Sequence, residues 1–497
     1  MDQVTHDVVV VGAGPAGMSA AVAAADAGLR VAVVDEQRRA GGQIFRQPPE
    51  EFAGVGVRPG AGYGWALPLL RDFESHPLVD HRPSSSALGV LREVDAPHER
   101  GAVLTVAVST PAGGVNLRAP RLVLATGAYD LPVAFPGWTL PGVMTAGGVQ
   151  SLLKSQHVRV AGPVVVAGSH PLLIVVAEQL RAAGADVVEV AFARGLPTPG
   201  EGVRARRAVP GHAAVLAETA RAVANLVAHG VRISTRTAVV AAHGRDGVES
   251  VELARIDSSW RQTGRRRTRA AATLVVGYGF TPSTELARQA GCEVEWSSPR
   301  GGWVVRHDES FAASLPGVWV AGEPTGVGGA EQARAEGRLA GLALARDADP
   351  HAVSADDLRA AEDDVRRAGR FAGVVQDLFE PDRAGMTSWA DHDTTICRCE
   401  LVTRGTVEQV LADNPFLSTA SAVKLECRAG MGPCQGRYCE GAVGALVSQA
   451  RDQAPADSGH FSGRFPVKPT PLGVLADLVP EDTDIHPSVS TDTAGAG

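Results

Sequence analysis

The feature that most constrains the fold is a glycine pattern near the N-terminus. Gly12, Gly14 and Gly17 stand in the segment VVVVGAGPAGMSAA, directly after an apolar run and at the start of an Ala-rich stretch. In a strand–turn–helix unit the first glycine permits a tight turn, the second lets a pyrophosphate approach the backbone, and the third lets the helix pack on the strand. The phosphates lie at the positive N-terminus of the helix. The pattern predicts a dinucleotide site, and by itself it does not distinguish FAD from NAD.

The segments that follow complete this unit. A helix is expected over residues 16–27 and a second strand over residues 30–35. In such folds an acidic residue at the end of the second strand binds a ribose hydroxyl. Asp35 occupies this place, and Glu36 beside it is the second candidate.

A second unit of the same kind is expected later in the chain. Its strand, helix and strand are predicted over residues 164–167, 172–183 and 187–190. Two such units indicate an α/β protein with two Rossmann-like dinucleotide domains built on parallel sheets.

The turn of this second unit lacks two of the three glycines of the dinucleotide-binding pattern. Gly168 remains, but His170 and Leu173 replace the second and third glycines. A side chain at His170 would obstruct a pyrophosphate, so we expect the fold to be retained without NAD(P) bound. The basic run 265–267 is interpreted as a solvated hairpin loop and not as a clamp for a 2′-phosphate.

Three further segments favour FAD at the first turn. Residues 121–129 read RLVLATGAY, residues 318–329 read VWVAGEPTGVGG, and residues 40–43 read AGGQ. In this order they resemble the two-dinucleotide-fold flavoprotein disulfide reductase superfamily, which binds FAD. By resemblance the cofactor contacts are Gly42, Gln43, Thr126, Gly127, Gly322 and Glu323. Glu323 stands where that superfamily usually has Asp, which implies a displaced contact to the ribityl chain.

Thiol–disulfide chemistry at the flavin is not expected. A disulfide reductase needs a redox-active cysteine pair near the GGQ segment or in the second dinucleotide domain. Cys292 is the only cysteine before residue 397. It is interpreted as a small core residue.

The other five cysteines form a compact module near the C-terminus. A CxC pair, Cys397 and Cys399, precedes a predicted helix over residues 403–411, and CRAGMGPCQGRYC spans residues 427–439. Four thiolates held by two loops suit a 2Fe-2S cluster, because thiolate is the soft ligand that iron–sulfur centres need. A structural zinc is the alternative. A flavin in the same chain favours the cluster, since zinc could receive no electron.

The module resembles the bacterioferritin-associated-ferredoxin type of 2Fe-2S domain. Nearly the whole chain is similar to the alpha subunits of heteromeric FAD-dependent amine dehydrogenases. That family includes the A subunit of opine oxidase, the B subunit of hydrogen cyanide synthase and the alpha subunits of hydroxyproline or proline dehydrogenases. The similarity includes FPGWTLPGVMTAGGVQSLLK, VGYGFTPSTEL and PVKPTPLG, which begin at residues 135, 276 and 466. It implies that the cluster ligands are Cys397, Cys399, Cys434 and Cys439. Cys427 falls where the family usually has Thr and is interpreted as a spare thiol.

These observations define a domain plan. The chain is expected to be an α/β protein with two Rossmann-like domains and a small α-rich 2Fe-2S domain. The expected parts are an FAD-binding domain (1–155 and 272–350), a degenerate NAD(P)-type domain (156–271), a helical linker (351–390), the 2Fe-2S domain (391–450) and a tail (451–497). The Pro-, Asp-, Ser- and Thr-rich sequence from Ala454 onward is expected to be disordered or to lie on a partner.

Composition and charge limit the kinds of partner and the cellular compartment to be expected. The net charge is −8 and charges of both signs are interspersed, which argues against nucleic acid as a partner. No apolar run approaches the length that a bilayer requires, and no secretion signal is visible. Clustered cysteines are typical of a metal site in a reducing compartment. We therefore expect a cytoplasmic protein.

The resemblance implies a division of labour. A glycine-oxidase-like FAD subunit would oxidise the substrate, and this chain would relay electrons through flavin and cluster to an acceptor. It would do so within a hetero-oligomer, with a small ferredoxin-like protein as a further candidate partner. No catalytic residue is predicted here, because no acid–base pair stands out. Two alternatives stay open: a self-sufficient NAD(P)H-dependent reductase, and a non-catalytic scaffold that holds an adenine nucleotide.

Overall fold

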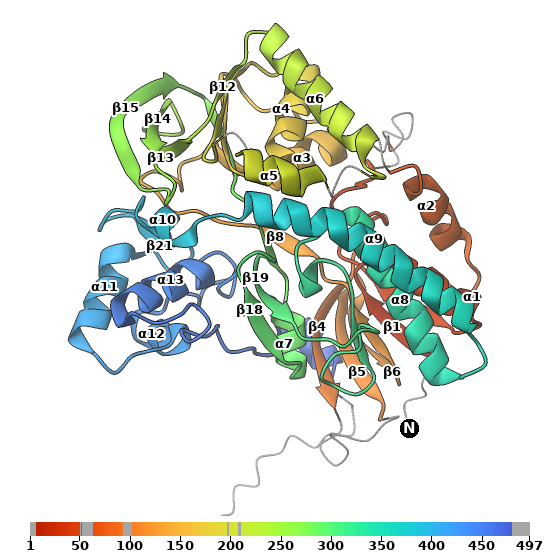
Figure 1. The fold of residues 1–497 in the computed structure, drawn as a ribbon. Helices are drawn as coiled ribbons and strands as arrows, with labels where there is room; N and C mark the ends of the chain where they lie inside the picture. The colour runs from red at the N-terminus through yellow and green to blue at the C-terminus, as the bar shows by residue number, and fades with distance from the viewer. Residues whose placement is uncertain are drawn as a thin grey trace, which may run out of the picture.

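The computed structural model describes residues 6–49, 51, 63–92, 102–195, 198–206 and 210–479. The fold consists of two parallel sheets and a helical C-terminal module, and a long helix, α9 (Ala355–Phe379), crosses the front of the molecule in Figure 1. The sequence-based fold class, two Rossmann-like domains followed by a small helical domain, is confirmed.

The first sheet is parallel, with strand order β20-β7-β1-β2-β3. Its strands are β1 (Val8–Val11), β2 (Val31–Val34), β3 (Val79–Arg82), β7 (Leu122–Leu124) and β20 (Val318–Val320). Val8 and Val10 face a core shared with helices, whereas Val9 and Val11 face a core shared with a second, antiparallel sheet. Burial on both faces explains why β1 is a continuous run of valines.

Helices cover one face of this sheet. They are α1 (Pro15–Asp26), α2 (Ala66–Ser75) and α8 (Ala330–Ala348), with α9 outside α8. The other face packs against β4 (Ser86–Arg92), β5 (Leu104–Thr110) and β6 (Gly113–Ala119). Small residues let α1 and α8 approach closely, since a Cβ on Gly337 would lie 2.0 Å from the carbonyl oxygen of Ala16.

The second sheet repeats the same plan with strand order β12-β11-β10-β16-β9. Its strands are β9 (Val143–Thr145), β10 (Val164–Gly168), β11 (Val187–Phe192), β12 (Arg232–Ser234) and β16 (Thr273–Gly277). Helices α3 (Ala146–Gln156), α4 (Leu172–Ala182) and α6 (Ala213–Ala228) pack on one face. The antiparallel strands β13 (Thr237–His243), β14 (Ser250–Ile256) and β15 (Gln262–Ala270) pack on the other. The predicted strand–helix–strand unit is therefore confirmed.

The basic run 265–267 does not form the predicted hairpin loop. It lies in β15, where Arg267 forms a salt bridge with Glu189 and Arg269 places its Nε 3.0 Å from the same carboxylate. The Glu189 side chain is 0% exposed. The prediction was wrong because nothing near the arginines in sequence shows that a buried carboxylate on β11 faces them.

The C-terminal module has its own small core. It consists of α10 (Arg383–Thr387), β21 (Thr395–Cys397), β22 (Val402–Thr403), α11 (Arg404–Asp413), α12 (Ala420–Cys427) and α13 (Glu440–Arg451). The predicted helix over residues 403–411 corresponds to α11. Between module and sheets lie β8 (Ala128–Asp130), β17 (Phe280–Pro282), α7 (Glu285–Ala290), β18 (Val294–Ser297) and β19 (Gly302–Val305) (Figure 1).

The segment after the module is not disordered in its described part, contrary to expectation. The first part of this segment packs on the module, where Phe461 joins the module's core, and the chain then returns to the first domain, where the Val467 amide donates to the Leu88 carbonyl at 2.8 Å. Helix α14 (Leu472–Asp477) then packs on β6, and the Gly114 amide donates to Asp477 Oδ2 at 2.9 Å. The end of the predicted tail, residues 480–497, lies outside the described residues.

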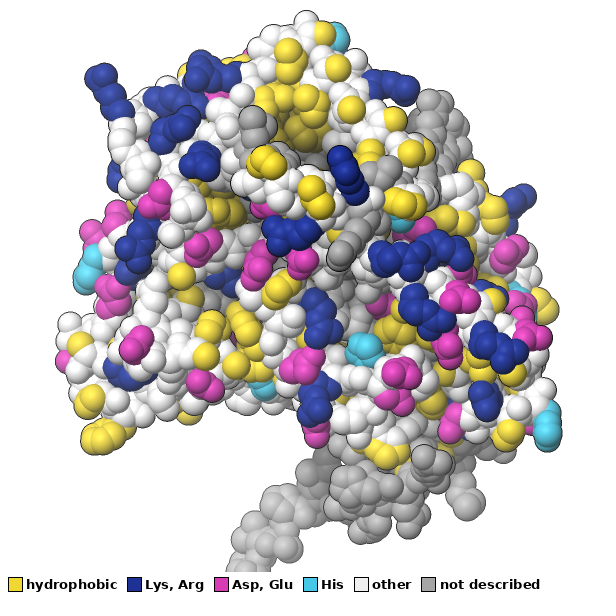
Figure 2. All heavy atoms as spheres, in the orientation of Figure 1, with side chains coloured by type: hydrophobic (Ala, Val, Ile, Leu, Met, Phe, Trp, Pro, Cys, Tyr) yellow, Lys and Arg dark blue, Asp and Glu magenta, His cyan; other side chains and the backbone are white. Residues whose placement is uncertain are grey.

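Two surface properties bear on partners. On the face drawn in Figure 2, Lys and Arg side chains are mixed with Asp and Glu over the lower part of the molecule, and several Lys or Arg side chains gather at the upper left, where Figure 1 places β13–β15. In the part of the chain that the structure describes, no helix combines the length and the apolar character needed to cross a membrane.

Candidate functional site

The first glycine turn lies between β1 and α1 as predicted. A Cβ on Gly12, whose φ is +105°, would lie 2.3 Å from the Ala125 carbonyl oxygen, and a Cβ on Gly17 would lie 1.8 Å from the Gly12 carbonyl oxygen. The chain's own backbone therefore requires both glycines. A Cβ on Gly14 would lie 3.8 Å from the nearest atom, the Gly42 Cα, so the protein itself would admit a methyl group there.

The N-terminus of α1 is available to an anion. No side chain caps it, and its first turn carries no acidic residue. The amide groups of the turn and the helix dipole favour a phosphate at this position. The space beside Gly14 and the uncapped helix end together fit a bound pyrophosphate.

Asp35 directly follows β2, and its carboxylate lies beside the same glycine turn. Its Oδ2 accepts a hydrogen bond from the Ala13 amide at 2.5 Å, and its Oδ1 accepts one from the Gln37 amide at 2.6 Å. Glu36 forms a salt bridge with Lys468, which comes from the C-terminal segment. Burial lowers the pKa of Lys468. Lys468 belongs to the PVKPTPLG motif, but no local pattern there indicated its role.

The GGQ and ATG segments meet at this turn. A Cβ on Gly42 would lie 2.7 Å from the Gly14 Cα, and Gln43 Nε2 donates to the Ala128 carbonyl at 3.3 Å. Thr126 Oγ1 donates to the Ser283 carbonyl at 2.6 Å. The structure thus brings together three of the four segments whose sequences favour FAD.

The fourth segment, with Gly322 and Glu323, joins them from β20. Gly322 has φ +79°, and a Cβ there would lie 2.8 Å from the Ala16 Cβ, so the loop sits directly on the start of α1. Glu323 Oε1 accepts a hydrogen bond from the Gly329 amide at 2.9 Å. Burial raises the pKa of Glu323 to about 7.

Glu336 on α8 is a buried carboxyl that sequence reasoning missed. Its Oε2 accepts hydrogen bonds from the Gly322 amide at 2.8 Å and from Thr325 Oγ1 at 2.9 Å. Burial raises its pKa to about 7 as well. Glu336 thereby holds the loop that presents Glu323. The helix sequence gives no signal for this role, because the carboxyl's partners lie on the preceding loop.

The four cysteines assigned to the cluster gather as two pairs. The thiol of Cys397 contacts that of Cys439, and the thiol of Cys399 contacts that of Cys434. Across the described residues, no three His, Cys, Asp or Glu side chains are grouped as a single metal ion would need. Four thiols in two pairs fit the donor set of a 2Fe-2S cluster, which takes two thiolates for each iron.

The surroundings of Cys397 favour its thiolate. The Cys439 thiol contact and the backbone amides of Gly430, Glu400 and Cys399 hold the pKa of Cys397 well below its usual range. The Gly430 amide lies 3.4 Å from the sulfur. Hydrogen bonds to the sulfurs are among the factors that set cluster potentials.

The fifth thiol of the module points elsewhere. Cys427 Sγ donates to the Val423 carbonyl, one turn earlier on α12, at 3.2 Å. The geometry supports its interpretation as a spare thiol.

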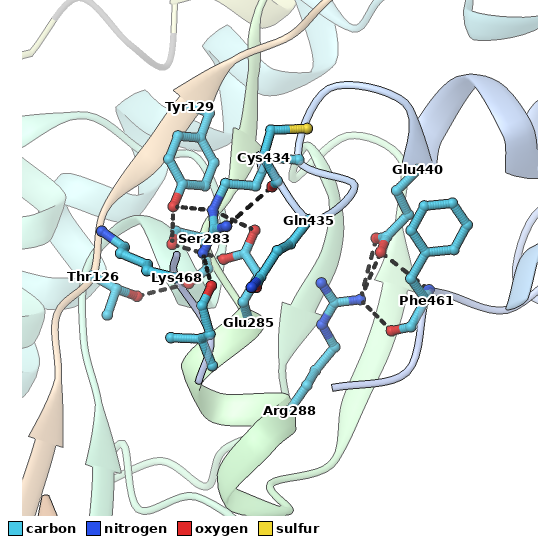
Figure 3. A network of polar contacts seen from close by, with 12 residues as sticks. Thr126, Tyr129, Ser283, Glu285, Arg288, Cys434, Gln435, Glu440, Phe461 and Lys468 are labelled. Atoms are coloured by element: carbon cyan, nitrogen blue, oxygen red, sulfur yellow. Dashed lines mark hydrogen bonds and ion pairs between the residues drawn. The ribbon is translucent and has the colours of Figure 1, made fainter. Parts of the chain in front are cut away.

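The module contacts the first domain through two arginines, and Figure 3 labels one of them, Arg288, with its partners Glu440 and Phe461. Arg437 Nε donates to the Tyr129 hydroxyl at 3.0 Å, and its Nη1 donates to the Cys434 carbonyl at 3.1 Å. Arg288 Nη1 lies 2.9 Å from Glu440 Oε2 and also donates to the Phe461 carbonyl. Neither arginine was predicted as a site residue, although Arg437 belongs to the CQGRYC sequence.

A cavity of about 390 Å³ lies beside these contacts. Tyr129 and Trp296 line it from the first domain, and Gln435 and Glu440 line it from the module. The two bodies are therefore not closely packed along this whole boundary, and the arginine contacts are specific points of attachment.

The second glycine turn differs from the first as predicted. His170 packs edge-on against Phe280 with ring centroids 5.0 Å apart, and Leu173 is fully buried beside Gly168. Burial lowers the pKa of His170 to about 4, so the ring is neutral at pH 7 and offers no charge to a phosphate. Phe379 of α9 lines the same small hollow. His170 stands at the position of the second glycine, where a pyrophosphate would approach the backbone, and the absence of NAD(P) binding stays a prediction.

Comparison with known proteins is consistent with this geometry. Residues 6–337 match the pyridine nucleotide-disulphide oxidoreductase family, and residues 395–449 match the BFD-like [2Fe-2S] binding domain. The chain is 33% identical to the A subunit of opine oxidase from Agrobacterium tumefaciens, over 95% of this chain and 92% of that protein. It is 34% identical to the HcnB subunit of hydrogen cyanide synthase from Pseudomonas aeruginosa, over 95% of this chain and 98% of that protein.

Solved structures support the fold. L-proline dehydrogenase from P. horikoshii superposes with a TM-score of 0.65 at 21% identity, covering 95% of this chain and 79% of that chain. Thioredoxin reductase from T. acidophilum gives a TM-score of 0.51 at 18% identity, covering 69% of this chain and 98% of that chain. The second likeness leaves the C-terminal module as an addition to the reductase-type fold.

Proposed function

Because this chain belongs to the pyridine nucleotide-disulphide oxidoreductase family, and to the group of oxidase components that includes HcnB and the A subunit of opine oxidase, we propose that it is the electron-transfer subunit of a heteromeric amine dehydrogenase. The family and the BFD-like domain imply FAD and a 2Fe-2S cluster, and the chain is an oxidoreductase. The finer proposal is that the complex oxidises an amino acid, imino acid or opine at a carbon–nitrogen bond.

The observation that carries the proposal is the contact between the two sites within one chain. Tyr129 follows the ATG segment at the FAD site, and Arg437 joins it to the backbone of Cys434 in the cysteine loop, residues 427–439. A flavin can accept two electrons as hydride and release them singly, and an iron–sulfur cluster carries one at a time. An adjacent flavin site and cluster site suit a relay better than a site of substrate oxidation.

We assign cofactor roles to the residues that the structure gathers. Gly12, Gly14 and Gly17 would admit the pyrophosphate, Asp35 and Glu36 the ribose, and the GGQ, ATG and Gly322–Glu323 segments the flavin half. Cys397, Cys399, Cys434 and Cys439 would hold the cluster. Cys427 is left out of the ligand set.

The chain's own residues would hold in position the loops that contact these groups. Glu336 holds the loop of Glu323, and Ser283 holds the ATG segment through its carbonyl. Substrate oxidation would take place on a partner, a glycine-oxidase-like flavoprotein, and this is supported by relatives that are themselves subunits of oxidases and synthases.

The test uses the purified chain with and without such a partner. Anaerobically prepared chain should contain FAD, about two iron and two acid-labile sulfide. Alone it should oxidise no amino acid, imino acid or opine, and together with the partner it should reduce an artificial dye. Zinc in place of iron would contradict the cluster assignment. Rapid, saturable flavin reduction by NADH or NADPH would instead support the self-sufficient reductase.

A further inference from the structure

The guanidinium of Arg437 lies between the cysteine loop and the first domain, where it contacts Tyr129 and Cys434, which are labelled in Figure 3. It is 11% exposed and makes three hydrogen bonds with three different segments. Nε donates to the Tyr129 hydroxyl at 3.0 Å, Nη1 to the Cys434 carbonyl at 3.1 Å, and Nη2 to the Val467 carbonyl at 2.8 Å. One rigid fork therefore fixes the positions of β8, the cysteine loop and the C-terminal segment relative to one another.

The series of contacts continues from Tyr129 to the ATG segment. Ser283 Oγ donates to the Tyr129 hydroxyl at 3.1 Å, and Thr126 Oγ1 donates to the Ser283 carbonyl at 2.6 Å. The Ser283 amide donates in turn to the Gly127 carbonyl at 2.9 Å. Polar contacts thus run from the ATG segment to the backbone of Cys434 with Tyr129 and Arg437 between them.

Arg437 also places a positive charge beside the cysteine loop. Its partner carboxylate, Glu285, lies 3.6 Å from Nε on the side of Tyr129, whereas Nη1 faces Cys434. A cluster gains one negative charge on reduction, so a nearby cation stabilises its reduced form. Removing the guanidinium would lower the cluster potential, because the reduced form would lose a nearby cation. It would also leave the Glu285 carboxylate unpaired, and this negative charge would lower the potential further.

We propose that Arg437 is the positioning residue that couples the FAD site to the cluster, raising the cluster's potential through its charge and fixing the distance between the two centres through Tyr129. This inference rests on the proposed relay, since it requires both centres in one chain. It assigns a function to the arginine of CQGRYC that its position in a ligand loop does not by itself explain.

The chain offers a matched control for mere attachment of the module. Arg288 also joins the first domain to the module, through Glu440 and the Phe461 carbonyl. None of the hydrogen bonds that the structure gives to Arg288, among the described residues, goes to Tyr129 or to a cysteine. If attachment alone matters, Arg288→Gln and Arg437→Gln should have similar effects.

The experiment compares Arg437→Gln, Arg437→Lys, Tyr129→Phe and Arg288→Gln in the full chain loaded with FAD and cluster. The cluster potential is measured by redox titration with electron paramagnetic resonance. Electron transfer from photoreduced flavin to cluster is measured by transient absorbance. Arg437→Gln should lower the potential and slow the transfer at least tenfold at unchanged iron content. Arg437→Lys should keep the potential near the original value but slow the transfer, because lysine carries the charge without the fork.

Two variants separate the possible outcomes. Tyr129→Phe should slow the transfer and leave the potential unchanged. Arg288→Gln should lower the potential, because it leaves Glu440 unpaired beside Cys439, but it should not slow the transfer as Arg437→Gln does. The proposal is overturned if Arg437→Gln leaves both quantities unchanged or if Arg288→Gln slows the transfer as much as Arg437→Gln. If Arg437→Gln does not retain its cluster, an unchanged transfer rate in Tyr129→Phe overturns the proposal. An unaltered chain without a reducible cluster, or whose flavin never reduces it, would contradict the proposed relay itself.

Discussion

Gly14→Ala is the substitution that best tests how the first glycine turn works. The structure leaves 3.8 Å between a Cβ at Gly14 and the nearest protein atom, the Gly42 Cα, which is an ordinary van der Waals contact. The cofactor-free chain should therefore fold with an unchanged melting temperature. If the pyrophosphate approaches the backbone here, the added methyl group should displace it.

The magnitude follows from the contacts that the methyl group would disturb. An amide hydrogen bond to a charged group contributes about 1.5–3 kcal/mol. Losing one such bond between the turn and a phosphate should weaken FAD binding about 10- to 150-fold. The dissociation constant is measured by titrating the cofactor-free chain with FAD and following the flavin fluorescence.

Gly12→Ala is the matched control. Its Cβ would lie 2.3 Å from the Ala125 carbonyl oxygen at a φ of +105°, so the fold itself should lose stability. The reasoning is refuted if Gly14→Ala binds FAD as tightly as the unaltered chain. It also fails if Gly14→Ala lowers the melting temperature of the cofactor-free chain as much as Gly12→Ala does.

Four further predictions concern other parts of the chain. Cys427→Thr should leave the cluster's paramagnetic resonance signal and iron content unchanged; loss of iron would make this thiol a ligand. Lys468→Met should weaken FAD binding severalfold in the fluorescence titration, because it removes the cation that pairs with Glu36, one of the two carboxylates assigned to the ribose. Equal affinity would argue against a ribose at Glu36. Arg267→Met should destabilise the second domain by about 3 kcal/mol in denaturant unfolding, since it leaves the buried Glu189 carboxylate short of a partner; a change below about 1 kcal/mol would contradict this. His170→Gly should increase the rate at which NADH bleaches the flavin only if this ring is the main obstruction, and an unchanged rate would assign the obstruction to the side chains around it.

Local patterns in the sequence were sufficient for much of the fold and of the FAD site. The strand–turn–helix units were predicted because glycine tolerance and hydrophobic periodicity depend on residues close in sequence. Gly17 illustrates this, since a Cβ there would meet the carbonyl oxygen of Gly12 in the same turn, whereas the close contact at Gly12 comes from Ala125, which lies far away in the sequence. The four-cysteine site was also predictable from the sequence, because the cysteines lie in two short segments with a characteristic spacing. The cofactor contacts of individual residues stay predictions.

Contacts between distant segments needed the tertiary structure. Arg437 and Tyr129 are separated by 308 positions, and no local pattern relates a ligand-loop arginine to a tyrosine after a strand. The pairing of Glu189 with Arg267 and the return of Lys468 to Glu36 have the same character. A buried or partly buried charge must find a partner wherever the fold places one, and that place depends on how whole sheets and loops pack. The sequence therefore determined which cofactors this chain is built to hold, whereas only the packed structure decided how their sites are joined.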